Sequence, residues 1–392
     1  MSTCPPDISL EVFETSCSQA CDGQWQIQDP NAINTTWDGE SEVVQTDEDT
    51  WKTDQNVCAG TFVATIEYPG DCFLEYEFVV GSADLQEYTD VLINSAENLN
   101  DIEANSHFSG NIEFTVDAIV EDMNWFFSTG SQIIIHEGVE VTFLNCHLRA
   151  CDSNWSGIEV LSSNLAVGKL NMQDCLIEHA ECAIKTRCAD PNYEFFPANS
   201  TDPFEATISY PADMGVLAGV LNIVDTDFNN NLKSVQVIEG VDDLEQSSFV
   251  RVDFAIDDYL YNHFNFELED EQFRNHVELW LTKGYDFFSC SFVNSILDQN
   301  YNPALWNDRG TGLSTWNSKF VVDRAEEAPN PSSEFRGLQF GISAENTNDP
   351  WNRLQVLNST FSNNQVAMFF HDICFHDVLH NDVYIGPQAD LP

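Results

Sequence analysis

The chain has 392 residues, which suits one large β-solenoid or two to three domains of ordinary size. Acidic residues number 65 against 14 basic ones, giving a formal net charge of −51, while 43% of the residues are hydrophobic. This composition predicts a folded protein rather than a disordered one. It excludes nucleic acid as a partner, because phosphate binding needs clustered Lys and Arg, and it disfavours anionic membrane surfaces.

Charge and cysteine content both predict an extracellular or cell-surface location. A strongly acidic surface repels itself at low ionic strength and suits saline or calcium-containing surroundings, so structural calcium is an option, and no other cofactor is expected. The chain has 12 cysteines, but no pair of CxxC knuckles indicates a zinc site. The later cysteines could equally be buried free thiols. No apolar stretch approaches the roughly 18 residues that cross a bilayer, so no membrane insertion is expected.

Residues 1–82 are predicted to form a small β-sandwich. Apolar and polar residues alternate over 60–68 and 73–80, and the turn-forming string Pro69-Gly70-Asp71 lies between these runs, which predicts a hairpin. Three tryptophans could stack on sugars, but in so small a sandwich they are assigned to the core: Trp25, Trp37 and Trp51.

Cysteine spacing in this block resembles a known repeat. The strings 15–23, 57–62 and 70–72 contain Cys17, Cys21, Cys58 and Cys72. In order and spacing they resemble the immunoglobulin-like repeats of gliding adhesins and related Bacteroidota surface proteins. The resemblance implies an exported module without enzymatic activity, and it implies two disulfides among these four cysteines.

Residues 83–107 are polar and acidic, and we interpret them as a linker or as a cap for the domain that follows. Over 108–392 short apolar runs are separated by Asn, Asp, Ser and Gly. No stretch with helical periodicity is long enough for βαβ units. An α/β enzyme fold is therefore not expected.

One short string recurs in this second region: a small polar residue, then Cys, Ser or Thr, then any residue, then a large apolar one. It occurs at 145–148, 174–177, 225–228, 289–292, 317–320 and 358–361, and 252–254 fills one gap. Two intervals are 29 residues (146 to 175) and 28 residues (290 to 318), which predicts a turn near 28 with insertions. Such a period without helices indicates a β-solenoid with a small polar residue at each corner.

A second resemblance covers about 110–386. The stretch 130–143, the corner at Asn145 and the string 155–160 are similar to the opening coils of right-handed β-helix domains in secreted Bacteroidota proteins. The predicted fold class is therefore all-β: a small Ig-like β-sandwich over 1–82 and a right-handed parallel β-helix, or β-solenoid, over 108–392. Insertions are expected near 189–213 and 258–275, where binding specificity could lie.

Many right-handed β-helices are polysaccharide lyases or hydrolases, so an enzyme has to be considered. Polygalacturonase-like enzymes combine Asn-Thr-Asp, a double Asp and Gly-His-Gly. The nearest strings here are 346–349, Asp242-Asp243 and Asp257-Asp258, and Gly-His-Gly is absent. So negative a surface would also repel the polyuronate substrate of a pectate-type lyase. No catalytic residue is assigned from the sequence.

The string 371–382 is the only dense set of potential metal ligands. On a strand, Asp372, Cys374 and His376 would share one face and could converge on a transition metal. The favoured interpretation is instead a last coil of the solenoid, with Cys374 buried and the histidines at its rim.

These observations predict a non-enzymatic extracellular structural or adhesive surface protein, which could self-assemble into filaments or sheets. Its partners would be copies of itself, other surface proteins or a polysaccharide. The alternative is a carbohydrate-active β-helix enzyme, either a polysaccharide lyase or a hydrolase. An enzyme should have carboxylates converging in a groove along one face, whereas a structural subunit should have flat complementary surfaces or exposed helix ends.

Overall fold

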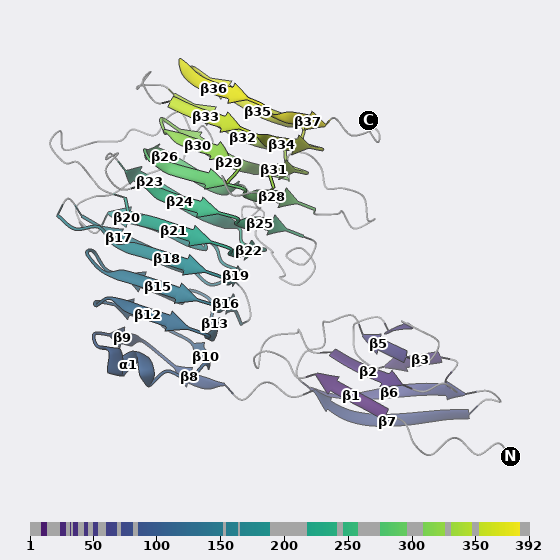
Figure 1. The fold of residues 1–392 in the computed structure, drawn as a ribbon. Coiled ribbons are helices and arrows are strands. Elements are labelled where there is room, and N and C mark those ends of the chain that lie inside the picture. Colours follow the sequence, from purple (N-terminus) through teal and green to yellow (C-terminus); the bar gives the residue numbers. More distant parts are fainter. Residues whose placement is uncertain are drawn as a thin grey trace. The chain divides into compact units, whose positions relative to one another are not determined.

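The computed structural model divides the chain into two units, Met1–Glu87 and Tyr88–Pro392, and each is described by itself (Figure 1). The structure describes residues 9–13, 24–28, 32, 34–37, 43–45, 50–53, 60–68, 72–80, 85–151, 154–163, 165–188, 218–240, 246–257, 275–295, 309–325, 331–346 and 353–384. The only helix in these ranges has five residues, and none of them forms a helix able to span a bilayer.

Seven described strands of the N-terminal unit form two antiparallel sheets, ordered β1-β2-β5-β4 and β3-β6-β7. Their bounds are β1 Ser9–Phe13, β2 Gln24–Gln28, β3 Asn34–Trp37, β4 Val43–Gln45, β5 Thr50–Thr53, β6 Gly60–Tyr68 and β7 Cys72–Val80. The hairpin expected from the sequence is confirmed, because β6 pairs antiparallel with β7 and Tyr68 lies opposite Cys72. Trp25 and Trp51 are buried, and Trp37 packs against Trp25 at 5.9 Å, so these rings contribute to the core.

The second unit consists of three parallel sheets, and a typical coil contributes one strand to each (Figure 1). Sheet 1 contains β12 Ala118–Glu121, β15 Glu140–Leu144, β18 Lys169–Gln173, β21 Val220–Val224, β24 Ser247–Val250, β27 Tyr285–Phe288, β30 Phe320–Asp323, β33 Arg353–Leu357 and β36 Phe375–Leu379. Sheet 2 contains β8 Gln86–Tyr88, β10 Asn105–Phe108, β13 Asn124–Phe127, β16 His147–Ala150, β19 Leu176–Glu178, β22 Asp227–Asn229, β25 Asp253–Ile256, β28 Ser291–Asn294, β31 Ser333–Arg336, β34 Ser359–Ser362 and β37 Asp382–Tyr384. Sheet 3 contains β9 Val91–Ile93, β11 Ile112–Phe114, β14 Gln132–Ile135, β17 Gly157–Ser162, β20 Ile184–Cys188, β23 Lys233–Gly240, β26 Asn275–Thr282, β29 Thr311–Trp316, β32 Phe340–Glu345 and β35 Val366–His371. The predicted all-β fold with stacked parallel strands is confirmed.

The first coil begins before residue 108. β9 pairs in parallel with β11, and β8 lies next to β10, so the segment expected to be a linker or cap supplies strands of its own. It also contains the helix α1, Ala96–Asn100. The Oγ of Ser95 accepts a hydrogen bond from the backbone N–H of Asn98 at 3.4 Å, which caps the start of this helix, and Leu99 is buried in the core.

The recurring string forms the corner between sheet 1 and sheet 2. Its first residue has a positive φ, for example 52° at Asn145 and 54° at Asp174, a conformation that Asn and Asp tolerate better than most residues. The second residue of the string is buried and forms a hydrogen bond with the equivalent residue of the next coil. For example, the backbone N–H of Cys146 donates to Sγ of Cys175 at 3.5 Å. The N–H of Cys175 donates in turn to Oγ1 of Thr226 at 3.4 Å. A small polar residue therefore satisfies a corner N–H that would otherwise be buried without a partner.

Several cysteines at these corners are free thiols. Cys146, Cys175 and Cys290 are buried and form no disulfide, which is one of the two possibilities left open by the sequence. The Sγ of Cys290 donates to the carbonyl of Phe249 at 3.3 Å, so this thiol behaves as one more small polar corner residue.

One member of the recurring string lies at a different corner, which corrects the predicted repeat. Asn317 has a φ of 48° but follows β29 of sheet 3 and precedes β30 of sheet 1. The residue that continues the corner above Cys290 is Ser333, whose Oγ accepts from the N–H of Cys290 at 3.1 Å. True intervals between corner residues include 23 (122 to 145), 26 (225 to 251) and 22 (358 to 380), so the shortest coils are shorter than 28 residues.

Aromatic side chains stack along the core beneath sheet 2. Phe254, Phe292, Phe335 and Phe361 follow one another on successive coils, with ring centroids 4.6 to 4.8 Å apart and nearly parallel planes. These separations equal the spacing of neighbouring strands, so each ring stacks on its equivalent in the next coil. The register of sheet 2 is therefore fixed from inside, which also fixes the positions of its outward side chains.

Candidate functional site

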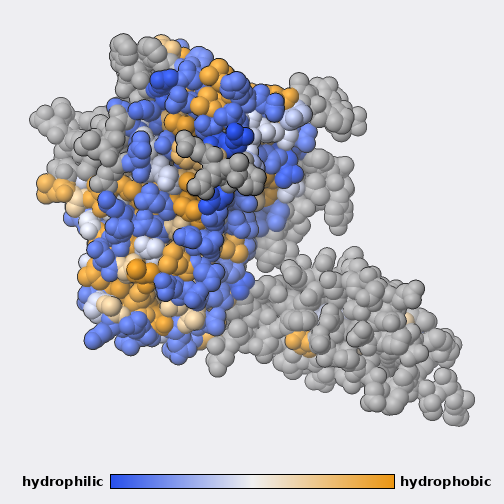
Figure 2. Space-filling model, viewed as in Figure 1, coloured by the Kyte–Doolittle hydropathy of each residue, from blue (hydrophilic) through white to orange (hydrophobic). Residues whose placement is uncertain are grey.

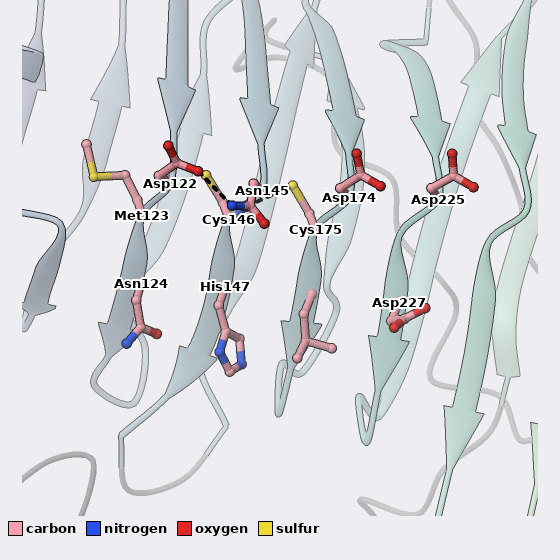
Figure 3. Close-up of a pocket in the computed structure, with 11 residues that line it drawn as sticks. Asp122, Met123, Asn124, Asn145, Cys146, His147, Asp174, Cys175, Asp225 and Asp227 are labelled. Atoms are coloured by element: carbon pink, nitrogen blue, oxygen red, sulfur yellow. Dashed lines mark hydrogen bonds between the residues drawn. The ribbon is translucent and has the colours of Figure 1, made fainter.

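The corner between sheets 1 and 2 forms an open groove of about 550 Å³ over the coils from Asp122 to Asp227 (Figure 3). It is lined by Asp122, Met123, Asn124, Asn145, Cys146, His147, Asp174, Cys175, Leu176, Asp225 and Asp227. Figure 3 shows the carboxylates of Asp122, Asp174 and Asp225 in a row at this corner, with Asn145 on the coil between Asp122 and Asp174. Hydrophilic residues also predominate on the face of the β-helix that Figure 2 displays.

The carboxylates of this row are held by the fold. Nδ2 of Asn145 donates to Oδ1 of Asp122 at 2.6 Å, and Nε2 of Gln173 donates to Oδ2 of Asp174 at 3.1 Å. Asp225 accepts two hydrogen bonds from Arg251, at 2.5 and 2.7 Å, and these lower the pKa of its carboxyl group. Asp225 therefore stays ionised to a lower pH than an ordinary aspartate.

Asp227 and Asp253 continue the groove onto the outer face of sheet 2. They lie on the adjacent strands β22 and β25 and are partners in the parallel register, so both side chains point outward from the same position. Partial desolvation raises the pKa of Asp227, and the charges of Asp253 and Glu178 raise it further. Desolvation also raises the pKa of Asp253, with a contribution from Glu334, while a hydrogen bond from Ser291 opposes the shift.

Glu178 is held by a neighbouring histidine. Its Oε2 lies 2.7 Å from Nε2 of His147 on the adjacent strand β16. Burial, the largest single influence, raises the pKa of Glu178, but the hydrogen bond with His147 and the charges of His179, His147 and Arg149 together outweigh it and lower the pKa overall. Glu178 is consequently ionised beside Asp227, and this charge favours the protonated form of Asp227.

Sheet 3 has a second polar outer face, but its carboxylates are paired with cations. Oε2 of Glu278 accepts from Nζ of Lys233 at 2.5 Å, and Glu159 lies 2.8 Å from the Nε of Arg187. Trp280 and Trp316 lie next to each other on this sheet, with ring centroids 6.0 Å apart. We assign no acid–base chemistry to this face, because the ion pairs given for it join each carboxylate to a separate basic side chain, Lys233, Arg187 or a histidine, rather than to another carboxylate.

The metal ligands considered from the sequence do not share a strand face. Asp372 has a φ of 55° and lies with Cys374 in the turn before β36, whereas His376 is inside that strand. Cys374 is exposed, not buried, because this is the last described coil. Within the described ranges no three His, Cys, Asp or Glu side chains gather into a metal site.

The disulfides expected in the N-terminal unit lie outside the described residues. This applies to Cys17, Cys21 and Cys58, and to the side chain of Cys72. In the β-helix Cys151 is disulfide-bonded. The two disulfides among the four N-terminal cysteines therefore remain a prediction.

Of the strings compared with polygalacturonases, the structure describes only Asn346 and Asp257, and neither lines the groove. Asp242-Asp243 and most of 346–349 lie outside the described residues, and so does Asp258. The sequence did contain a signal for the aspartate pair at the end of the groove, of which Asp227 is a lining residue. Asp227 and Asp253 each directly precede the large apolar residue of the recurring string, so aligning the strings on that residue places these two aspartates side by side.

We predict that the stability of the fold depends on salt. With 65 acidic and 14 basic residues, repulsion between carboxylates destabilises the compact state, and unfolding relieves it. The melting temperature should rise by several degrees between low salt and 1 M NaCl, and millimolar calcium should raise it further by bridging carboxylates. Thermal unfolding followed by circular dichroism in the three buffers measures both effects. A melting temperature indifferent to all three would leave the charge as a means of solubility only.

No known protein family matches this sequence, and no curated protein matches it either. Among solved structures, the family 28 exopolygalacturonase of Yersinia enterocolitica aligns with 96% of this chain and 98% of its own, at 8% identity and a TM-score of 0.20. Dex49A from Penicillium minioluteum aligns with 87% of this chain and 76% of its own, at 6% identity and a TM-score of 0.21. At these values no residue's role is transferred from either protein.

The comparisons correct the expected function. The expectation of a non-enzymatic structural or adhesive surface protein is contradicted by the match to the exopolygalacturonase. The alternative, a carbohydrate-active enzyme, is favoured instead. The geometry agrees with that change, because carboxylates converge in a groove along one corner of the helix, which was the feature expected of an enzyme.

Proposed function

We propose that the protein is a carbohydrate-active β-helix enzyme that hydrolyses glycosidic bonds at the groove between sheets 1 and 2. The observation that carries this proposal is the pair of aspartates in register on adjacent strands, Asp227 and Asp253, each with a raised pKa. Glycoside hydrolysis generally needs two carboxyl groups, one protonated and one ionised, on either side of the scissile bond.

The surroundings of the two aspartates assign their roles. Asp227 has ionised or acidic neighbours, Glu178 and Asp253, so it holds its proton longer and acts as the general acid. The pKa of Asp253 is raised as well, by desolvation and by Glu334, but the hydrogen bond from Ser291 opposes that shift, so we assign the ionised role to Asp253. It is therefore the carboxylate that attacks or stabilises the sugar carbon as the bond to the leaving group breaks.

Strand spacing predicts the stereochemistry. Neighbouring strands lie about 4.8 Å apart, so two carboxyl groups at one register position are separated by about 5 Å. That is the separation of enzymes in which the second carboxylate forms a covalent glycosyl intermediate, whereas a base that activates water stands farther away. Hydrolysis should therefore retain the anomeric configuration.

The test is an assay of the purified chain against a panel of soluble polysaccharides. New reducing ends should appear, and proton NMR of the first product should show retention. The double variant Asp227→Asn/Asp253→Asn should lose more than about 100-fold in rate. The matched control is Asp382→Asn, an exposed aspartate at the same register position four strands away, which should keep the wild-type rate. Inversion would contradict the role of Asp253, and a panel left intact would contradict the function.

The proposal extends to the rest of the chain. We place the enzyme outside the cell, in keeping with its acidic charge, and we propose an immunoglobulin-like module for the N-terminal unit. Its support is the pair of antiparallel sheets of four and three strands.

A further inference from the structure

The charges that line the groove are almost all negative. Of its lining residues, four are aspartates and one is a histidine, and that histidine is bound to Glu178. Arg251, which follows β24, is bound to Asp225 through two hydrogen bonds and so neutralises one of the four aspartates. No cation among the lining residues is thus left to bind an anionic sugar.

A groove of this kind discriminates between substrates by charge. Charges of one sign along a cleft reinforce one another and concentrate ligands of the opposite sign. Salt screens charges that are more than about 8 Å apart at physiological ionic strength. A charged group of the ligand in contact with a groove carboxylate is closer than that, so its interaction with the carboxylate is not screened out. A polyuronate would place its own carboxylates against Asp122 and Asp174, whose described hydrogen bonds come from the neutral amides of Asn145 and Gln173 rather than from a cation.

We infer that the substrate is a cationic glycan, a polymer of amino sugars with free, protonated amino groups. This inference rests on the proposed function and specifies its substrate class. Ammonium groups along the polymer can pair with the row of carboxylates at this corner, which are Asp122, Asp174 and Asp225, with Asn145 at the corner position between the first two (Figure 3). A glycosidic bond would then lie against Asp227 and Asp253 at the end of that row.

The first test compares polymers that differ in charge. Chitosan, the same chitosan after N-acetylation, and polygalacturonate are offered to the wild-type protein, and kcat/KM is measured for each. We expect chitosan to be hydrolysed fastest and polygalacturonate slowest. The preference for chitosan should shrink between 0.05 and 0.5 M NaCl, because the screening length falls from about 14 Å to about 4 Å over that range. Equal rates on chitosan and its acetylated form, or a preference for polygalacturonate, would overturn the inference.

Variants localise the effect to the groove. Asp122→Asn/Asp174→Asn removes two of its charges, and the fold should accept it because Asn145 and Asn358 occupy equivalent corners with the same positive φ. The ratio of the rates on chitosan and acetylated chitosan should fall by about fivefold or more. The control Glu97→Gln/Glu137→Gln removes the same charge from exposed sites outside the groove and should leave the ratio unchanged. An equal fall in both variants would show that net charge, not the groove, sets the preference.

Binding separates this inference from the proposed function. Chitosan oligosaccharides are titrated into Asp227→Asn by calorimetry, and binding should weaken as NaCl increases. If no polymer is hydrolysed but this binding occurs, the hydrolase proposal fails and the ligand class stands. If hydrolysis occurs without such binding or charge preference, the ligand class is wrong and the function stands.

Discussion

Asp227→Asn should reduce hydrolysis of polysaccharides by about 100- to 10,000-fold, the usual contribution of a general acid. The loss should depend on the leaving group. A sugar oxygen needs a proton as the bond breaks, whereas an activated aryl leaving group departs as a stable anion. Aryl glycosides should consequently be cleaved by Asp227→Asn at rates much closer to wild type.

The pH profile gives an independent check on Asp227. Its pKa lies above the ordinary value for aspartate, chiefly because the carboxyl group is partly desolvated. The protonated form is the active one, so the rate should fall as the pH rises through that raised pKa, and this alkaline limb should disappear in Asp227→Asn. The control is Asp286→Asn, an aspartate of sheet 1 whose pKa is likewise raised by desolvation but which does not line the groove. A wild-type profile for Asp227→Asn would exclude it as the acid.

The raised pKa of Asp227 also affects the pH dependence of folding stability. A carboxyl group whose pKa is raised by folding favours the fold in its protonated form. Its contribution is present below the unfolded-state pKa and is lost as the pH rises through the folded-state value. At neutral pH both Asp227 and Asp253 therefore oppose folding slightly, as expected of groups retained for chemistry.

Sequence patterns predicted the β-helix because its corners impose a local chemistry. A residue with positive φ favours Asn or Asp, and the buried position after it needs a small side chain that accepts a hydrogen bond, so the same short string recurs on many coils. The string alone does not distinguish the corner between sheets 1 and 2 from the corner between sheets 3 and 1. Asn317 satisfies the same backbone requirement between sheets 3 and 1, so the sequence pattern wrongly grouped it with the corners between sheets 1 and 2.

The site was harder to predict, because it depends on which residues of distant coils lie in register. Aligning the recurring strings places Asp227 beside Asp253, but only the structure shows that the two strings belong to consecutive coils, 26 residues apart (225 to 251), because insertions vary the coil length. The opposite error occurred at Asp372, Cys374 and His376. Their alternation suggested one strand, but the positive φ at Asp372 marks a turn, and β36 begins only at Phe375.

The second large effect concerns Gly157, where β17 begins. Gly157 has a φ of +86°, and a Cβ added there would lie 1.8 Å from the carbonyl oxygen of Cys182 and 2.9 Å from that of Ala183. Both contacts are with backbone of the next coil, which cannot move without breaking the register of sheet 3. Gly157→Ala should therefore lower the free energy of unfolding by more than about 4 kcal/mol, in the range reserved for severe core defects.

Gly130→Ala is the matched control, because it separates steric clash from backbone strain. Gly130 has a φ of +78°, close to that of Gly157, but a Cβ there would meet nothing within 4 Å. Its replacement should cost only the strain of a left-handed alanine, about 1–2 kcal/mol. Urea unfolding of the wild type and both variants measures the difference. Equal losses in the two variants would mean that the positive φ alone requires glycine at these turns. A much larger loss at Gly157 would mean that the coils of sheet 3 stack too closely there for any side chain.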